Sequence, residues 1–145
     1  MMSWRSFLRT AVLPCAALLC APLPTQARTH HAAAPGYTVA QAERGAELYA
    51  RSCALCHGED LGGTFQTPPL TGRFVRNWAG TPLSELARYI HDAMPLMAPG
   101  TLSSGDVLAL IAYLLQENGA KPGKWPLPDR PARLDHLVFP ASPAR

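Results

Sequence analysis

Apolar residues recur at steps of three and four along three stretches of this chain of 145 residues. Such spacing places the apolar side chains on one face of a helix. The stretches cover residues 38–53, 81–94 and 103–119, and no other segment alternates apolar and polar residues over more than a few positions. The pattern therefore predicts a compact all-α fold of about three to four helices.

The second predicted helix has residues suited to both of its ends. Thr81 is the expected N-cap, and Pro82 would occupy the first helical position. The helix must end near Met94, because Pro95 disfavours the α conformation of the residue before it. Met94 is therefore expected at a helix exit, with its thioether free to point inward.

The last predicted helix also carries agreeing signals at its ends. Ser103 with Asp106 forms a variant of the capping box, and Asn118-Gly119 supplies a stop. Its sequence is broadly apolar, so we expect this helix to be mostly buried.

The first predicted helix, with Thr38 as its N-cap, contains an unusual glycine. Gly45 costs about 1 kcal/mol relative to alanine inside a helix, so the close approach of another backbone is the expected compensation. Tyr49 lies one turn further along the same side. We expect Leu110 and Tyr113 of the last helix to meet these two residues.

The beginning of the chain has the features of a secretory signal. Two arginines precede an apolar run over residues 11–21, and residues 25–27 offer a small-residue cleavage site. The run is too short and too rich in proline to be a membrane span. We predict cleavage after Ala27 and export to the periplasm, with membrane contact only through a partner or an uncleaved signal.

The predicted organisation is a cleaved signal (1–27), a flexible lead (28–37), one helical domain (38–119) and a C-terminal tail (120–145). The tail contains six prolines and cannot form long helices. A strap over the core, a docking tail and disorder are all compatible with its composition.

Composition and charge exclude several classes of function. The formal charge of +3 comes from 13 basic and 10 acidic residues that are scattered along the chain, so nucleic-acid binding is not indicated. The sequence contains no glycine-rich phosphate loop and no recognisable hydrolytic motif.

The segment with the most specific chemistry is Cys53-Ala54-Leu55-Cys56-His57, at the end of the first predicted helix. Two cysteines three positions apart, with histidine directly after the second, form the c-type haem attachment pattern. On one helical turn the two thiols can each add to a vinyl group of one porphyrin, which carries the next imidazole under the metal. We predict one covalent haem c, attached through Cys53 and Cys56, with His57 as an iron ligand.

Other interpretations of this motif have less support. A thioredoxin-like redox pair requires a βαβ setting, which the pattern does not provide, and a structural zinc site requires further cysteines. A disulfide or a metal clip remains open.

The second axial ligand decides whether the iron carries electrons or binds a small molecule. The downstream candidates are Met94, Met97, His91 and His136. Met94 is favoured because of its position at a helix exit, and Met97 is its main rival. An open site is a further alternative.

These motifs together resemble the class I cytochromes c, particularly the small bacterial proteins that serve periplasmic dehydrogenases and oxidases. The similarity covers about residues 40–119 and follows a fixed order of motifs. These are Gly45 with Tyr49, Cys53 to His57, Pro68-Pro69-Leu70 with Gly72, Met94-Pro95, and Leu110 with Tyr113.

The resemblance implies that the first and last helices cross at Gly45 and Tyr113. It also implies that a backbone carbonyl near Pro68 accepts the second ring proton of His57. Trp78, in the segment after this loop, is compatible either with a bond to a haem propionate or with ordinary core packing.

The function expected from the resemblance is single-electron transfer through a His/Met-ligated haem. The partners would be a dehydrogenase or membrane donor and an oxidase or reductase acceptor, and the protein itself would not be an enzyme. The alternatives are a haem subunit fixed in a larger oxidoreductase and an open-site haem enzyme or gas sensor. Only two lysines, Lys121 and Lys124, are present, so steering by a positive patch is not expected.

Overall fold

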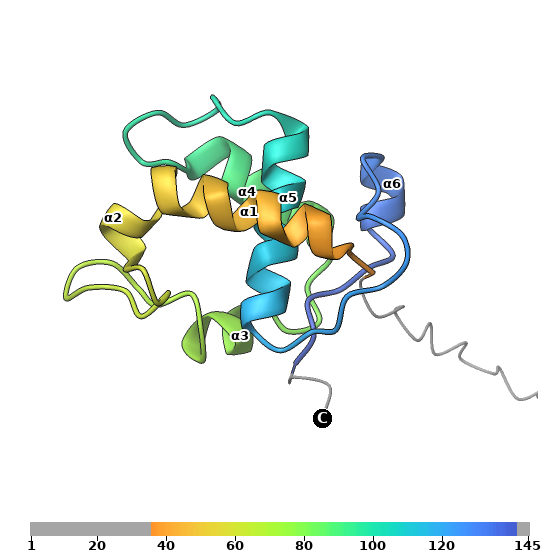
Figure 1. Ribbon diagram of the computed structural model, residues 1–145, viewed down its shortest axis with the longest axis horizontal. Helices are drawn as coiled ribbons and strands as arrows, with labels where there is room; N and C mark the ends of the chain where they lie inside the picture. The colour runs from red at the N-terminus through yellow and green to blue at the C-terminus, as the bar shows by residue number, and fades with distance from the viewer. Residues whose placement is uncertain (1–35, 142–145) are drawn as a thin grey trace, which may run out of the picture. The chain divides into compact units, whose positions relative to one another are not determined.

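Two long helices cross at the centre of the fold, α1 (Val39–Ser52) and α5 (Ser104–Glu117) (Figure 1). The computed structural model describes residues 36–141, which belong to one compact unit. A Cβ atom on Gly45 would lie 2.0 Å from the carbonyl oxygen of Ala109 and 2.8 Å from the Cβ of Tyr113. The predicted crossing at Gly45 and Tyr113 is therefore confirmed, and the backbone that approaches Gly45 is that of Ala109 rather than Leu110.

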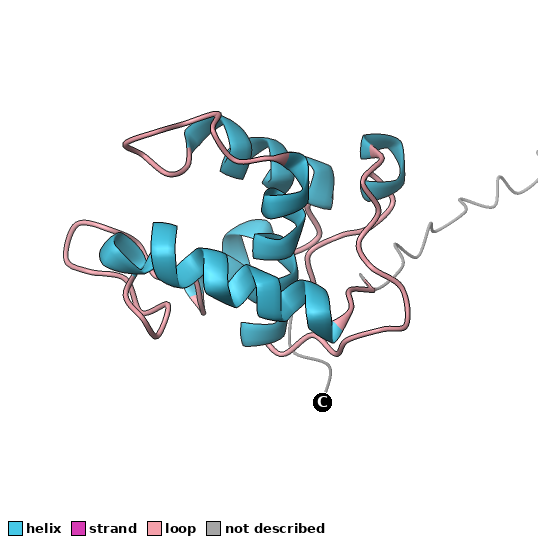
Figure 2. Ribbon diagram, turned by 45° about the horizontal axis from the view of Figure 1, so that its top comes forward, coloured by secondary structure: helices cyan, strands magenta, loops and turns pink. Residues whose placement is uncertain are grey.

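The described residues contain four further helices, which are α2 (Ala54–His57), α3 (Arg73–Trp78), α4 (Leu83–Ala93) and α6 (Pro131–Leu134). Figure 2 shows helices and loops but no strand in this part of the chain. The all-α fold predicted from the apolar pattern is confirmed. The three long helices are the ones that the pattern indicated, and α2, α3 and α6 are each six residues or shorter.

The start of α5 has the predicted cap. Ser103 accepts a hydrogen bond from the backbone N–H of Asp106 at 3.2 Å, and its hydroxyl donates to the Asp106 carboxylate at 2.6 Å. Arg44 of α1 also binds this carboxylate, at 2.7 Å. These hydrogen bonds, first from Ser103 and then from Arg44, lower the pKa of Asp106. The same side chain therefore caps α5 and links it to α1.

The start of α4 differs from the prediction by one residue. The N-cap is Pro82 rather than Thr81. The carbonyl of Thr81 accepts a hydrogen bond from the backbone N–H of Phe139 at 3.0 Å, and the N–H of Leu83 donates to the carbonyl of Leu137 at 2.8 Å. The C-terminal segment thus provides the acceptor that an N-cap side chain would otherwise supply.

Residues 120–141 form a strap across the helices, one of the three alternatives for the tail. Leu127, Leu134 and Phe139 are buried in the same core as α1, α4 and α5. Phe139 meets the ring of Phe74 edge-on, with centroids 5.4 Å apart. The strap therefore contributes to the core.

The residue before α1 is more ordered than expected. Tyr37, assigned to the flexible lead, is fully buried, and its hydroxyl donates to the carbonyl of Ala120 at 2.6 Å. Its own carbonyl accepts from the N–H of Gly123 at 2.7 Å. The signal predicted over 1–27 and most of the lead lie outside the described residues. No helix within 36–141 has the length and apolar character to cross a membrane.

Candidate functional site

The cysteine-histidine motif lies where α1 gives way to α2. Cys53 ends α1 and begins α2, and the backbone N–H groups of Cys56 and His57 both donate to its carbonyl, at 3.1 and 2.9 Å. Gly58 ends α2 with a φ of 79°, as the sequence indicated. One short turn therefore presents both thiols and the imidazole.

Both thiols of this turn are free, with Cys53 half-buried and Cys56 exposed. Burial, with a smaller contribution from Cys56, raises the pKa of the Cys53 thiol to about 11. Cys53 is therefore a protonated thiol at neutral pH, unlike the low-pKa thiolates of thioredoxin-like redox pairs. Among the described residues, no group of three His, Cys, Asp or Glu side chains is placed to hold a metal ion.

The His57 ring has one defined partner. Its Nδ1 atom lies 3.1 Å from the carbonyl oxygen of Pro68. Because a carbonyl only accepts, Nδ1 carries the proton, and Nε2 keeps the lone pair that a metal requires. This is the backbone acceptor that the resemblance implied.

The loop that supplies this carbonyl is tied to the motif by backbone hydrogen bonds. The N–H of Gly63 donates to the carbonyl of His57 at 2.7 Å, and the N–H of Leu70 donates to the carbonyl of Leu61 at 2.8 Å. Gly63 has a φ of 75°, and a Cβ atom there would lie 2.5 Å from the carbonyl oxygen of Thr67. The fold of the loop therefore requires glycine at this position.

Tyr49 connects the motif to the helix crossing. Its hydroxyl donates to the carbonyl of Gly58 at 2.6 Å, and its ring packs against that of Tyr113 with centroids 5.2 Å apart. Burial raises the pKa of Tyr49 to about 12, with additional contributions from Cys53 and other neighbours. Its hydroxyl therefore remains a donor throughout the neutral range.

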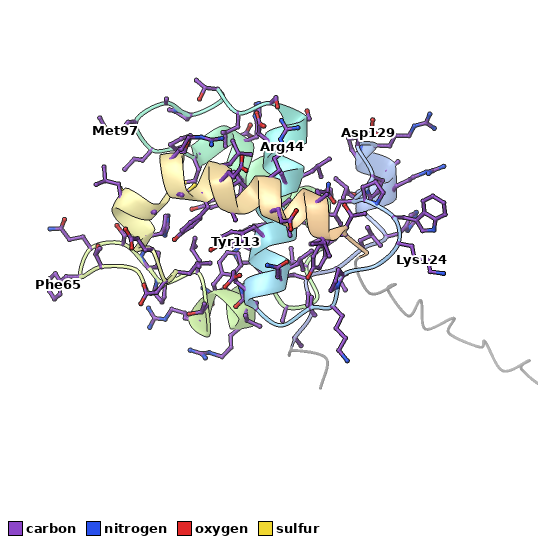
Figure 3. All side chains as sticks on the ribbon, in the orientation of Figure 1. Arg44, Phe65, Met97, Tyr113, Lys124 and Asp129 are labelled. Carbon is purple, nitrogen blue, oxygen red and sulfur yellow. The ribbon has the colours of Figure 1, made fainter. Side chains whose placement is uncertain are left out.

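Met94 ends α4 in an extended conformation, with φ −127° and ψ 148°. Its side chain is half-buried and packs against the core, whereas Met97 is 92% exposed. Figure 3 shows Met97 on the loop after α4, directed away from the helices. His91 is half-exposed and lies 2.8 Å from a carboxylate oxygen of Asp92.

The two ligand-bearing segments lie at one end of the described unit. Figure 1 shows α2 and the loop that follows α4 at this end. Two free thiols, an imidazole oriented by a carbonyl and a half-buried thioether fit the donor set of haem c. Trp78 is half-buried between the rings of Phe74 and Tyr89, with centroids 6.2 and 5.6 Å away.

A cleft elsewhere does not share these residues. It has a volume of about 510 Å³, lies between α4, α5 and α6, and is lined in part by His91 and Asp92. None of the cysteines, His57 or Met94 contributes to it. His91 therefore belongs to a different surface of α4 from the candidate site.

Two supporting contacts were missed by the sequence analysis. Tyr49 was expected to fill the space beside Gly45, but its bond to Gly58 was not expected. Asn118 was expected only to end a helix, yet its side chain also bonds the carbonyl of Leu70. No local sequence signal identifies either acceptor, because both are backbone carbonyls of irregular segments.

Comparison with known proteins agrees with the geometry. The family described as "Cytochrome C oxidase, cbb3-type, subunit III" matches residues 40–114, a range that contains Cys53, Cys56, His57 and Met94. The chain is also 38% identical over 78 residues to a thiosulfate dehydrogenase from Stutzerimonas stutzeri (strain A1501). This match covers 49% of the chain but only 25% of that protein.

Among solved structures, the chain is similar to a crystal structure of the sulfane dehydrogenase SoxCD from Paracoccus pantotrophus. The sequence identity is 28% and the TM-score 0.49, over 92% of this chain and 68% of that one.

The family match covers more than half of the chain, and covalently bound haem c is a property of this family. The chain therefore belongs to the c-type cytochromes, in the family described as cytochrome c oxidase, cbb3-type, subunit III.

Proposed function

We propose that this domain transfers single electrons through one haem c, tethered by Cys53 and Cys56 and ligated by His57 and Met94. The observation that carries the proposal is the 3.1 Å contact between His57 Nδ1 and the carbonyl oxygen of Pro68. When bound, the haem supplies an iron that alternates between the ferric and ferrous states.

The residues of the chain have separate tasks in this proposal. The cysteines hold the group in place, and the carbonyl of Pro68 fixes the orientation of His57 and increases its strength as a donor. The half-buried side chain of Met94 closes the opposite position. Since no substrate touches the metal, no catalytic side chain is required and the domain is not itself an enzyme.

Met94 is the better supported of the two methionines. A ligand on the inner side of the site must lie against the core, as the half-buried Met94 does. Met97 is 92% exposed, so using it would require the loop to move.

The surface around the site suits an uncharged partner. Four large apolar side chains, which we call the apolar rim, are exposed on α2 and the two neighbouring loops. They are Leu55, Phe65, Leu96 and Met97. Figure 3 places Phe65 and Met97 at the same end of the described unit, and residues 61–72 and 94–105 include no charged side chain. Redox partners would therefore dock here through apolar contact rather than charge.

A second candidate is a haem subunit fixed in a larger oxidoreductase. The matched part of the chain corresponds to only 25% of the thiosulfate dehydrogenase, so that relative contains much additional protein. The apolar rim would suit a permanent neighbour equally well. In either setting we propose a periplasmic location, which requires export by the signal over 1–27.

An absorption spectrum of the exported holoprotein tests the proposed chemistry. We expect a low-spin six-coordinate spectrum with a methionine-to-iron band at the red end of the visible range, unchanged by carbon monoxide. A high-spin ferrous form that binds carbon monoxide at once would instead support an open-site enzyme or sensor. Met97→Ala is the matched control for Met94→Ala, and only the Met94 variant should lose the band.

Purification from the native periplasm separates the two settings. A free carrier elutes at the size of the single chain, whereas a fixed subunit elutes with a larger oxidoreductase. For a free carrier, the rate of electron exchange with its partner should change little with ionic strength, because the apolar rim contains no charge. A steep loss of rate with added salt would contradict the apolar docking surface.

A further inference from the structure

We propose that Asn118 is a positioning residue for His57, because its side chain holds the loop whose carbonyl orients the imidazole. The inference rests on the proposed function, in which His57 binds iron. Asn118 lies at the C-terminal end of α5, and it touches neither His57 nor Pro68 in the contacts described above.

The amide of Asn118 bridges two distant segments. Its Nδ2 atom donates to the carbonyl oxygen of Leu114 at 2.8 Å and to that of Leu70 at 3.0 Å. Both partners are acceptors only, so the amide nitrogen must face them. Leu70 is 48 residues away along the chain, and the bond is partly buried, where water competes less for the donor.

A short and stiff path leads from Leu70 to the histidine. Leu70 is also fixed by its N–H bond to the carbonyl of Leu61, which is 2% exposed. Only Pro69 separates Leu70 from Pro68, and the rings of both prolines lock the backbone φ angles. A shift of Leu70 therefore passes to the Pro68 carbonyl, which lies 3.1 Å from His57 Nδ1.

The consequence is electronic as well as structural. A hydrogen bond from Nδ1 to a fixed carbonyl makes the imidazole a stronger donor, which favours ferric iron. When the loop loses its tie to α5, the bond to Pro68 should lengthen and weaken. The reduction potential should then rise, and the Nδ1 proton should exchange faster with solvent.

The test compares two variants of the holoprotein. Asn118→Ala removes the bridge. Tyr37→Phe, the matched control, removes a hydroxyl bond of 2.6 Å to the carbonyl of Ala120, two residues beyond Asn118, without touching the loop. Both variants should lower the resistance to denaturant, because each loses one partly buried hydrogen bond near the end of α5.

The readouts are the reduction potential and the solvent exchange of the His57 Nδ1 proton, measured by NMR in the reduced protein. For Asn118→Ala we expect a higher potential and exchange about tenfold faster, the factor that corresponds to the net free energy of one hydrogen bond. For Tyr37→Phe we expect neither change. Equal changes in the two variants, or no change in Asn118→Ala, would overturn the proposal.

A second variant keeps the test decisive if Asn118→Ala folds poorly. The hydroxyl of Asn118→Ser can still bond the carbonyl of Leu114 four residues earlier, but it is too short to hold Leu70. It should reproduce the rise in potential with a smaller loss of stability, and an unaltered potential would count against the bridge. The proposed function fails separately, if the unsubstituted protein carries no haem or has a high-spin spectrum.

Discussion

The two sides of the proposed haem site, one formed by His57 and the other by Met94, are anchored differently. On the histidine side, bonds to Pro68, Gly63 and Tyr49 connect α2 with its loop and with α1. Asn118 extends these connections to α5. The histidine side is thus part of the helix crossing.

The methionine side has fewer connections to the scaffold. In the loop after Met94, the N–H of Ala98 donates to Pro95 and the hydroxyl of Thr101 donates to Ala98, so these bonds stay within the loop. Gly100 reaches back to the carbonyl of His91 in α4. Local opening is easiest where few buried contacts must be broken, so this side should open first.

Removing each ligand in turn gives the largest contrast. His57→Ala should abolish a correctly ligated haem protein, because the oriented donor beside the tethers is lost. Met94→Ala should keep the covalent haem and leave the opposite position open to carbon monoxide. Optical spectra of the two purified variants measure this difference. Similar spectra for both would show that the two sides are equivalent.

Filling the notch at the crossing should have the next largest effect. In Gly45→Ala the new methyl group would lie 2.0 Å from the carbonyl oxygen of Ala109, so α1 and α5 must separate. We expect a loss of about 3 kcal/mol in the free energy of unfolding, at the upper end for overpacking. Gly105→Ala is the control, because its new methyl group would meet only Ser103 Oγ at 3.9 Å.

The control should be neutral or gain up to about 1 kcal/mol, since alanine is the better helix former. Urea unfolding of both holoproteins gives the comparison. Gly45→Ala should also disturb the histidine side, because α1 carries Tyr49 and the Cys53 tether. An unchanged midpoint for Gly45→Ala would refute the tight crossing.

The sequence predicted the parts of the fold that are encoded locally. The apolar repeats predicted α1, α4 and α5, and Ser103 with Asp106 predicted the cap of α5. Gly45 predicted a close helix crossing, because a glycine inside an amphipathic helix needs a packing reason.

What could not be predicted depends on contacts between distant segments. The cap of α4 comes from Leu137, 54 positions beyond Leu83, and the choice of Ala109 over Leu110 depends on the rotation of α5. The strap could not be distinguished from a disordered tail, because the burial of Phe139 requires a core that other segments build. The identity of the site residues still awaits the tests proposed here.

The Tyr49 hydroxyl gives a smaller test of the histidine side. Tyr49→Phe removes the bond to Gly58 and should cost about 1 kcal/mol of unfolding free energy. In the unsubstituted protein, the pKa of Tyr49 is raised from 10.0 to about 12 in the folded state. The associated stability is therefore complete below pH 10 and is lost as the pH rises toward 12.

Urea unfolding between pH 9 and about 12 measures this dependence. The phenylalanine variant should lose less stability across that range than the unsubstituted protein. Identical slopes for the two proteins would show that the hydroxyl is not buried as described.

The smallest expected effect concerns Arg44 and Asp106, which link α1 to α5 at the surface. Arg44→Ala should cost about 0.2–1 kcal/mol, as for exposed ion pairs. Since the folded-state pKa of Asp106 is lowered, its contribution is present above the ordinary aspartate pKa and is lost as the pH falls through the folded value. Thermal unfolding at neutral and acidic pH tests this, and an effect that grows on acidification would contradict it.

The most direct test of the haem assignment is the intact mass of the exported protein before and after extraction with acid-acetone. We expect one haem per chain that survives extraction and is absent from a variant with alanine at both Cys53 and Cys56. A protein with no added mass, or one whose colour is extracted, would contradict covalent attachment to this turn.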